Sequence, residues 1–308
     1  MDLLAPLKKL DNKAKRSLKE NIMMTYEIFK KALLEEVKKN FPEKGLTIKT
    51  IRKINKEEQE FLTFSQGSSA VVYLKDLYER FLKEQDFKKI VEAAIQILSI
   101  EAKDMENIAS ADYIKTHCFF QLINAEKNHD LLLESVHYDY FDLAVVCRVL
   151  TTGVLTTSDS EEIQSYILKK HHMQALNVEE EELFRLAKEN TKRFFHPEMI
   201  SLAEALGLPE GMCPPITVLT NDQRTYGATS IIYESILQQF AKERGDFYLL
   251  PSSTHEFLLL PKEEGMTPSP LKKIVREVNA TAVQTEDLLS DNIYFYSKRT
   301  QKIYIITD

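Results

Sequence analysis

Scarcity of glycine is the feature of this sequence that most restricts its fold and chemistry. The chain has 8 glycines among 308 residues, against a usual share of ~7%, and they are isolated from one another. No GxG, GxGxxG or GxxxxGK pattern occurs. This argues against dinucleotide-binding folds, P-loop enzymes and protein kinases, which hold phosphates in glycine-rich loops. We therefore predict long regular elements and no cofactor.

The composition predicts a folded protein that is not a general nucleic-acid binder. Hydrophobic residues make up 44% of the chain, which is enough for a sizeable core. The 40 basic and 47 acidic residues give a net charge of −7, whereas a general nucleic-acid binder carries an excess of basic residues. The length fits one large domain or two ordinary ones.

Two features predict a reduced, cytoplasmic protein. No apolar run approaches the ~18 residues that cross a membrane, and the N-terminus lacks the apolar core of a signal peptide. The three cysteines, Cys118, Cys147 and Cys213, are odd in number and form no CxxC, whereas secreted domains usually carry an even disulfide framework. We expect three reduced thiols, with no pair close enough to bridge. We also expect no metal site, because His255-Glu256 begins an HExxH pattern that fails at Leu259.

The N-terminal part predicts a basic extension followed by a helix-rich region. Residues 1–23 have four leucines near helical spacing and six basic residues, which we read as a solvated helix packing one leucine edge. The alternatives are a nucleic-acid or partner contact and a disordered leader. The basic residues are Lys8, Lys9, Lys13, Lys15, Arg16 and Lys19. Residues 24–110 predict a helix over 25–40, paired strands at 46–54 and 61–64, and further helices.

Residues 111–308 predict the core domain, with strands and helices that do not alternate strictly. Residues 119–123 and 144–150 are continuous β-branched and aromatic runs, which are typical of buried strands. The fold class is therefore α+β, with a largely antiparallel sheet, or sheets, packed against helices.

Within this domain, residues 214–308 predict one antiparallel sheet. Strands are expected near 216–219, 247–250 and 257–260, and a terminal hairpin near 293–306. Helices near 231–244 and 270–279 carry one-sided apolar spacing, the latter through Leu271, Ile274, Val275 and Val278. We expect both helices on a single face of the sheet.

Two predicted turns hold the candidate site residues. Ser252, Ser253, His255 and Glu256 lie within five residues, and hydroxyl, imidazole and carboxylate groups together could support acid–base chemistry. Ordinary turn bonding, with the hydroxyls on the backbone, is the competing interpretation. Asn221 and Arg224 follow another strand and are candidate binding residues with the same alternative.

For His255 we expect a structural role. The residue lies where a polar turn enters an apolar strand, and a half-buried imidazole needs partners for both nitrogens. Glu256 is the next residue and would point to the opposite face. We therefore expect His255 to bond to its own turn or to the 221–224 loop rather than to Glu256.

Seven short motifs resemble those of a family of uncharacterised bacterial proteins. They occupy residues 141–146, 189–191, 219–221, 227–228, 250–256, 277–281 and 289–291. The resemblance covers roughly residues 24–308 and implies that 1–23 are an extension. It also implies an origin in anaerobic, gut-dwelling Gram-positive bacteria, often near mobile elements, but no activity, cofactor or catalytic residue. The chain departs from the family pattern at Cys147, where a tyrosine is expected, and over 157–167.

Two main functions follow from these observations. The first is a cytoplasmic binding or interaction protein whose partner is another protein, in a role related to mobile elements or defence. The alternative is a hydrolase or transferase of unrecognised type that uses the turn from Ser252 to Glu256. Nucleic-acid binding through residues 8–19 ranks last because the chain is acidic overall. The sequence does not predict an oligomeric state.

Overall fold

The structure is a computed structural model that describes most of the chain beyond residue 23. The described residues are 24–55, 58–65, 71–99, 107–151, 163–176, 178–209 and 211–306. The predicted extension over 1–23 lies outside them. The chain forms two compact units, residues 1–51 with 59–102 and residues 52–58 with 103–308. The predicted domain limits at 24–110 and 111–308 stay a prediction.

In the first unit, the described residues form three helices and a small sheet around a core of their own. Its helices are α2 (Tyr26–Lys38), α3 (Leu74–Glu84) and α4 (Phe87–Leu98), and its strands are β1 (Leu46–Arg52), β2 (Glu58–Phe64) and β3 (Val72–Tyr73) in the order β1-β2-β3. Phe29 and Leu33 of α2 pack with Leu62 of β2 and Ile90 of α4. The helix over 25–40 and the strand pair that the sequence predicts are confirmed.

The second unit contains a four-stranded antiparallel sheet. Its strands are β4 (Cys118–Asn124), β5 (His137–Tyr140), β6 (Leu143–Leu150) and β7 (Ser165–Ile167). β4 runs along one side of β6, while β5 and β7 share the other side. The two buried strands predicted at 119–123 and 144–150 are confirmed as β4 and β6. Helices α6 (Ala111–His117), α7 (His129–Glu134), α8 (Lys170–Leu176) and α9 (Glu180–Phe194) belong to this part of the unit.

The outer edge of β4 is closed by threonine side chains rather than by another strand. The N–H of Phe120 donates to Oγ1 of Thr191 on α9, 2.8 Å away. The N–H of Leu122 donates to Oγ1 of Thr229 on the 3-10 helix η2 (Gly227–Ile232), 3.0 Å away. A buried, unpaired N–H is costly, so these hydroxyls allow the edge of β4 to be buried.

The second unit also contains a six-stranded antiparallel sheet. Its order is β13-β12-β10-β11-β9-β8. The strands are β8 (Pro197–Ser201), β9 (Thr217–Asn221), β10 (Phe247–Ser253), β11 (Glu256–Pro261), β12 (Ile293–Ser297) and β13 (Lys302–Ile306). The single antiparallel sheet predicted for residues 214–308 is therefore confirmed, with β8 added at one edge.

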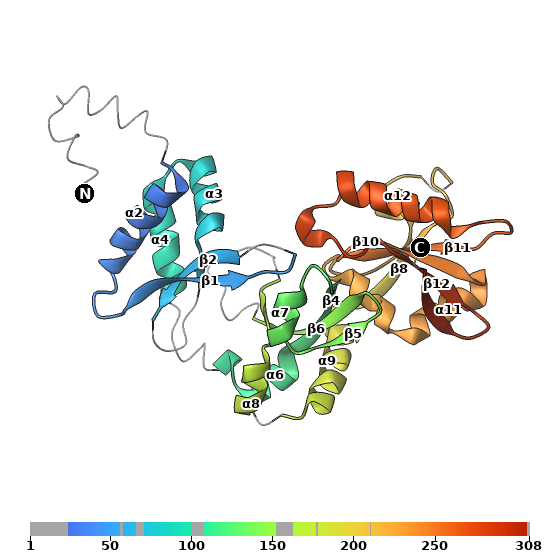
Figure 1. The fold of residues 1–308 in the computed structure, drawn as a ribbon, viewed down its shortest axis with the longest axis horizontal. Coiled ribbons are helices and arrows are strands. Elements are labelled where there is room, and N and C mark those ends of the chain that lie inside the picture. Colours follow the sequence, from blue (N-terminus) through green and yellow to red (C-terminus); the bar gives the residue numbers. More distant parts are fainter. Residues whose placement is uncertain are drawn as a thin grey trace, which may run out of the picture. The chain divides into compact units, whose positions relative to one another are not determined.

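The prediction that both helices lie on a single face of this sheet is wrong. Helix α11 (Glu234–Arg244) packs through Leu237 in one core with Phe247, whereas α12 (Pro268–Thr281) packs through Val275 in another core with Tyr248. Neighbouring strand residues point to opposite faces, so the two helices cover opposite faces. Figure 1 shows α12 above the sheet and α11 below it.

The orientation of α12 also differs from the expected one. The apolar spacing predicts that Ile274 and Val278 face the sheet, but they are 56% and 41% exposed. The buried residues are Lys272, Val275 and Asn279. Two of these three are polar and hold partners elsewhere in the unit, so hydrophobic spacing alone could not predict this orientation.

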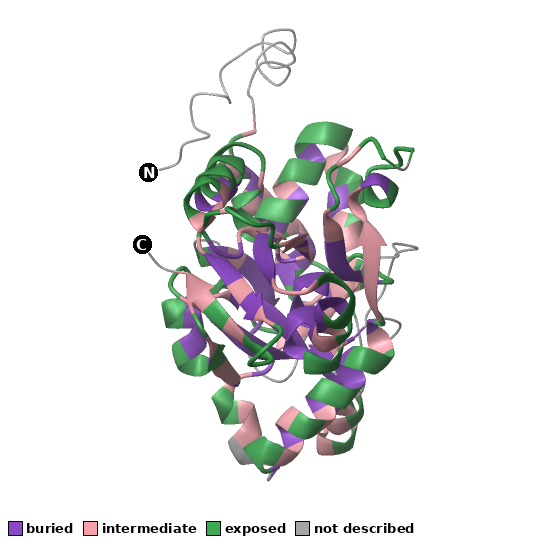
Figure 2. Ribbon diagram, turned by 90° about the vertical axis from the view of Figure 1, so that its right-hand side faces the viewer, coloured by how far each residue is buried: buried purple, intermediate pink, exposed green. Residues whose placement is uncertain are grey.

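One core joins the two sheets of the second unit. Phe120 and Val145 of the four-stranded sheet belong to the same buried cluster as Leu249 and Phe257 of the six-stranded sheet. Figure 2 shows the buried residues concentrated in the strands, with the exposed residues on the outer sides of the helices. Within the described residues, no helix is both long and apolar enough to cross a membrane.

The three cysteines are free, but two of them are neighbours. Cys118 pairs with Val149 and Cys147 pairs with Phe120, so the two cysteines occupy diagonal positions on one face of β4 and β6. Both are buried. The predicted reduced state of the three cysteines is confirmed, while the expectation that no pair lies within bridging distance stays a prediction. The neighbouring Cys118 thiol, followed by burial, raises the pKa of the Cys147 thiol.

Candidate functional site

The turn that carries His255 is shorter than the sequence predicts. β10 extends to Ser253 and β11 begins at Glu256, so only Thr254 and His255 connect them. The N–H of His255 donates to Oγ of Ser253 (3.0 Å), and the His255 carbonyl accepts from Oγ1 of Thr220 on β9 (2.9 Å). The backbone of His255 is therefore held from both sides.

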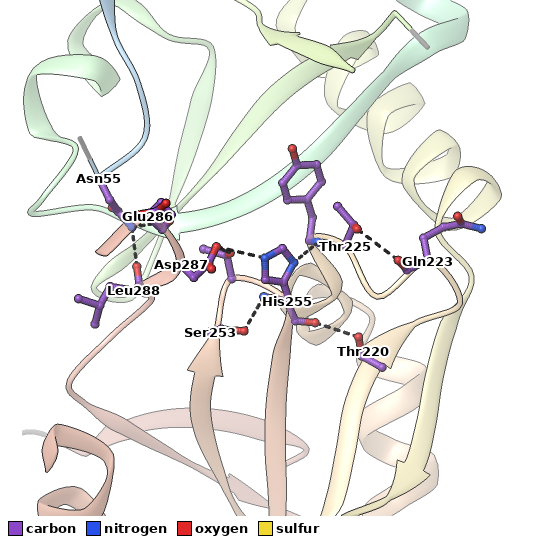
Figure 3. Close-up of polar contacts among 11 residues, drawn as sticks. Asn55, Thr220, Gln223, Thr225, Ser253, His255, Glu286, Asp287 and Leu288 are labelled. Carbon is purple, nitrogen blue, oxygen red and sulfur yellow. Dashed lines mark hydrogen bonds and ion pairs between the residues drawn. The ribbon is translucent and has the colours of Figure 1, made fainter. Parts of the chain in front are cut away.

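The imidazole of His255 has a partner on each nitrogen. The N–H of Tyr226 donates to Nδ1 (3.2 Å), and Nε2 lies 3.1 Å from Oδ1 of Asp287. An amide N–H can only donate, so Nδ1 accepts, and Nε2 carries the proton that is donated to the carboxylate. Figure 3 shows the ring with Asp287 on one side and the turn that carries Thr225 on the other.

The other predicted catalytic residues do not reach this imidazole. Oγ of Ser252 donates to Oε1 of Glu256 (3.0 Å), which forms a separate pair. Oγ of Ser253 accepts the His255 backbone N–H and contacts no ring nitrogen among the described hydrogen bonds. A serine nucleophile requires a base within hydrogen-bond reach, and the four residues do not form that arrangement.

The contacts of His255 agree in part with the expected ones. The ring bonds to Tyr226, just beyond the 221–224 loop, and the backbone bonds within its own turn; Glu256 is not a partner. Asp287, in the 3-10 helix η3 (Thr285–Asp287), was missed. It lies 32 residues along the chain from His255, and no local pattern distinguishes it from the other 46 acidic residues of a chain with 47.

The two predicted binding residues have separate positions. Asn221 is buried and closes its own turn: Nδ2 donates to the Thr225 carbonyl (2.7 Å), and Oδ1 accepts the N–H of Gln223 (3.1 Å). Arg224 is exposed and lies 3.6 Å from the carboxylate of Glu198. The structure does not bring these side chains together with the imidazole.

Gly227 explains why this part of the chain packs so closely. A Cβ at this position would lie 2.3 Å from Oγ1 of Thr220 and 2.4 Å from the His255 carbonyl oxygen. The preceding residue, Tyr226, has a φ of 57°, which is a strained conformation for a residue with a side chain. The backbone from 226 to 227 is therefore pressed against the His255 turn.

An aromatic and cationic stack adjoins the His255 turn. The ring of Tyr226 stacks with His255 (centroids 6.3 Å apart) and with Phe119 (6.1 Å). The guanidinium of Arg148 lies 5.5 Å from the centre of the Tyr226 ring, within cation–π range. Arg148 is held by Gln121 of β4 and by Ser165 of β7. No local pattern predicts this stack, because its four members come from four separate segments.

Asn55 ties residues 52–58 to the segment that carries Asp287. Its Nδ2 donates to the carbonyls of Glu286 (3.1 Å) and Leu288 (2.8 Å), on either side of Asp287, as Figure 3 shows. The N–H of Asn55 donates to Oδ1 of Asn128, and Nδ2 of Asn128 donates back to Oδ1 of Asn55. Both asparagines are buried, so each supplies partners that the other needs.

A cavity of about 500 Å³ opens beside this asparagine pair. Both basic and acidic side chains line this cavity. Among them, Arg52 pairs with Asp130 and with Glu58. The lining residues are Arg52, Lys53, Asn55, Glu58 and residues 126–131. Because the basic and acidic side chains of the lining balance one another and are partly paired, the cavity favours neither an anionic nor a cationic ligand.

A second polar cluster surrounds Asp142. Its carboxylate accepts hydrogen bonds from Ser290 (2.5 Å), Asn292 (3.0 Å) and Tyr294 (2.5 Å). Burial, followed by the charge of Asp142, raises the pKa of the Tyr294 hydroxyl. These residues hold the turn between β5 and β6 against β12. The Ser290 and Tyr294 hydroxyls both donate to the Asp142 carboxylate, so neither is free to act as a nucleophile. Within the described residues, no three His, Cys, Asp or Glu side chains are placed to hold a metal ion.

Large apolar side chains are exposed in one connection at the edge of the six-stranded sheet. Leu206 is 59% exposed, Leu208 45% and Met212 71%. They follow the short helix α10 (Leu202–Ala205), which comes directly after the edge strand β8. We call the described residues of this segment, 206–209 and 211–212, the apolar connection. No sequence motif pointed to it.

The comparisons with known proteins place the chain in a family without giving it an activity. The model of a family of unknown function (DUF5688) matches residues 26–298, which is most of the chain. No curated protein and no solved structure matches it. The predicted resemblance to an uncharacterised family is confirmed, while its host range and its link to mobile elements stay predictions. The chain therefore belongs to the DUF5688 family, a family of unknown function.

Proposed function

We propose that this protein is a non-catalytic binding protein whose partner is another protein, held at the apolar connection. The observation that carries the proposal is the exposure of three large apolar side chains within seven residues, Leu206, Leu208 and Met212. Single exposed apolar residues are ordinary, but a cluster in one segment marks an interaction surface.

The backbone at the start of the apolar connection supports this proposal because Gly207 and Leu208 are held in place. The N–H of Leu208 donates to the Ala203 carbonyl (2.8 Å), and the N–H of Gly207 donates to the Glu204 carbonyl (3.1 Å). Gly207 has a φ of 64°, so these bonds form a Schellman-like end to α10. A hydrophobic contact by the residue after the glycine usually completes that motif, yet Leu208 stays 45% exposed. A preorganised apolar surface loses less entropy when a partner binds.

The geometry of the His255 turn gives no comparable support to a hydrolase or transferase. A general base needs a free nitrogen within reach of the proton that it removes. Both nitrogens of His255 are engaged, one by a backbone amide and one by a carboxylate. The enzyme alternative through Ser252, Ser253 and Glu256 therefore ranks second.

Two finer expectations remain part of the proposal. A reduced, cytoplasmic setting rests on the three free cysteines, and a role near mobile elements or in defence rests on the family resemblance alone. Cell fractionation followed by detection of the native protein tests the first. Growth of a deletion strain under phage challenge tests the second.

The test of the proposed function is direct binding to a partner. The full chain serves as bait in extracts of its host, and captured proteins are purified and titrated against it. The triple variant Leu206→Ser, Leu208→Ser, Met212→Ser should weaken binding at least tenfold. The matched control is Leu133→Ser, since Leu133 is 61% exposed on α7, outside the apolar connection. A partner that binds the wild type and the triple variant equally well, or the absence of any partner that binds the purified chain, would contradict the proposal.

A further inference from the structure

Helix α12 exposes an apolar stripe to solvent. Ile274 is 56% exposed and Val278 41%, while Leu271 is partly buried. These three residues are spaced i, i+3 and i+7, so they lie along one side of the helix. We call them the α12 stripe.

The helix cannot rotate to bury this stripe without losing buried polar contacts. On its opposite side, Nδ2 of Asn279 donates to the Ser290 carbonyl (2.9 Å) and to Oδ1 of Asp291 (2.8 Å). Nζ of Lys272 donates to the Ile306 carbonyl (3.4 Å). Removing the partners of buried polar groups is costly, so these anchors hold the stripe toward solvent.

Two charged residues flank the stripe on one side. Lys273 and Glu277 are four residues apart and both exposed, and their helical positions place them along the same flank. The described salt bridges do not include a pair between them. One positive and one negative charge therefore lie side by side beside an apolar stripe.

We propose that the α12 stripe is the contact between two copies of this chain, with the two α12 helices antiparallel across a two-fold axis. In an antiparallel helix pair, a given flank of one helix faces the same flank of the other. Lys273 then faces the partner's Glu277, and Glu277 faces the partner's Lys273. A two-fold interface must be self-complementary. The flank with Lys273 and Glu277 is self-complementary in charge, and the α12 stripe is apolar on both copies.

The size of the contact sets its strength. A helix of 14 residues is about 21 Å long, so the pair buries a small area, and small interfaces form weak, transient complexes. The dimer is therefore concentration-dependent. This interface is separate from the apolar connection and does not depend on the proposed function.

Sedimentation equilibrium of the full chain over a range of concentrations tests the stripe. The wild type should form a reversible dimer, and Ile274→Ser with Val278→Ser should shift it to monomer. Leu133→Ser, another exposed apolar side chain on a helix, should leave the dimer intact, as should the triple variant of the apolar connection. Circular dichroism of each variant verifies its fold.

A charge exchange tests the two-fold arrangement itself. Lys273→Glu and Glu277→Lys should each weaken dimerisation about tenfold, because each change creates two like-charge contacts across the axis. The double variant restores both pairs and should recover the wild-type association. A wild type that stays monomeric, a dimer that the stripe variants leave intact, or a double variant that fails to recover would each overturn the proposal. Failure of the double variant alone would show that the two copies meet in an arrangement other than the antiparallel one proposed.

Discussion

The N–H of Leu122 in β4 donates to the hydroxyl of Thr229, 107 residues further along the chain. Leu122 is fully buried and Thr229 is 2% exposed. The bond closes the edge of the four-stranded sheet with a residue from η2, the element that also packs on β9 of the six-stranded sheet. The Thr229 hydroxyl thus satisfies one amide of this strand edge and links the two sheets of the second unit through η2.

Thr229→Val should destabilise the protein by about 1–3 kcal/mol, because valine keeps the shape of threonine but leaves the Leu122 N–H without an acceptor. Urea unfolding of the variant measures this loss. Thr281→Val is the control, since Thr281 is exposed at the end of α12, and exposed substitutions usually change stability by less than about 0.5 kcal/mol. Equal stability of both variants would show that water or a backbone shift satisfies the Leu122 amide.

Gly227→Ala should be more damaging than its small size suggests. The new Cβ would meet Oγ1 of Thr220 and the His255 carbonyl at distances well below van der Waals contact. Overpacking of this kind costs about 1–3 kcal/mol. Gly265→Ala is the comparison: its Cβ meets nothing within 4 Å, but its φ of +77° costs about 1 kcal/mol. The midpoint of urea unfolding should fall further for Gly227→Ala, and the reverse order would contradict the packing described here.

Local sequence patterns predicted the strands that bury an apolar side and pair with a strand close by in the sequence. β10 with β11 and β12 with β13 are such pairs, with the alternating or continuous apolar residues that mark strands. β5 and β8 were not predicted: β5 is short and largely polar, and all five residues of β8 are only partly buried at the sheet edge. Their pairing depends on neighbours, which a local pattern does not contain.

At the candidate site, the sequence predicted only the contacts between residues that lie close together in the chain. The turn at His255 and its backbone bonds to Ser253 follow from adjacent residues. The partners Asp287 and Tyr226 lie 32 and 29 residues away, and the orientation of α12 depends on Asn279 reaching Ser290 and Asp291. These contacts arise from tertiary packing, so no periodicity in the sequence encodes them.

The cysteines should differ sharply in reactivity. Cys213 is partly exposed, whereas Cys118 and Cys147 are fully buried in the neighbouring strands β4 and β6. A thiol reagent should modify one cysteine per chain in the native protein and three after denaturation, since reaction requires access and a thiolate. Peptide mapping of the modified protein identifies the site. A disulfide recovered from protein prepared without oxidant would contradict the reduced state.

Stability should fall as the pH drops because of His172. Burial, then the charges of His171 and Lys169, lower its pKa, and Nδ1 of His172 accepts the Lys169 N–H (3.2 Å). Between that lowered value and the unfolded value of ~6.5, the unfolded chain binds more protons than the folded chain. The stabilisation is therefore complete above about pH 6.5 and is lost as the pH falls below it. His172→Gln should reduce the difference in unfolding free energy between about pH 7.5 and about pH 5.5, and an unchanged difference would assign the pH dependence to other groups.

The central claim is that the His255 side chain has a structural rather than a catalytic role. The free energy of unfolding of His255→Ala tests this claim most directly. The variant leaves both the Tyr226 amide and the Asp287 carboxylate without the imidazole, so we predict a loss of about 1–3 kcal/mol in urea unfolding. Asp287→Ala should also destabilise, and the double variant should cost less than the sum, because the two residues share one interaction. An unfolding free energy of His255→Ala equal to that of the wild type would contradict the account and move the enzyme alternative ahead of the binding protein.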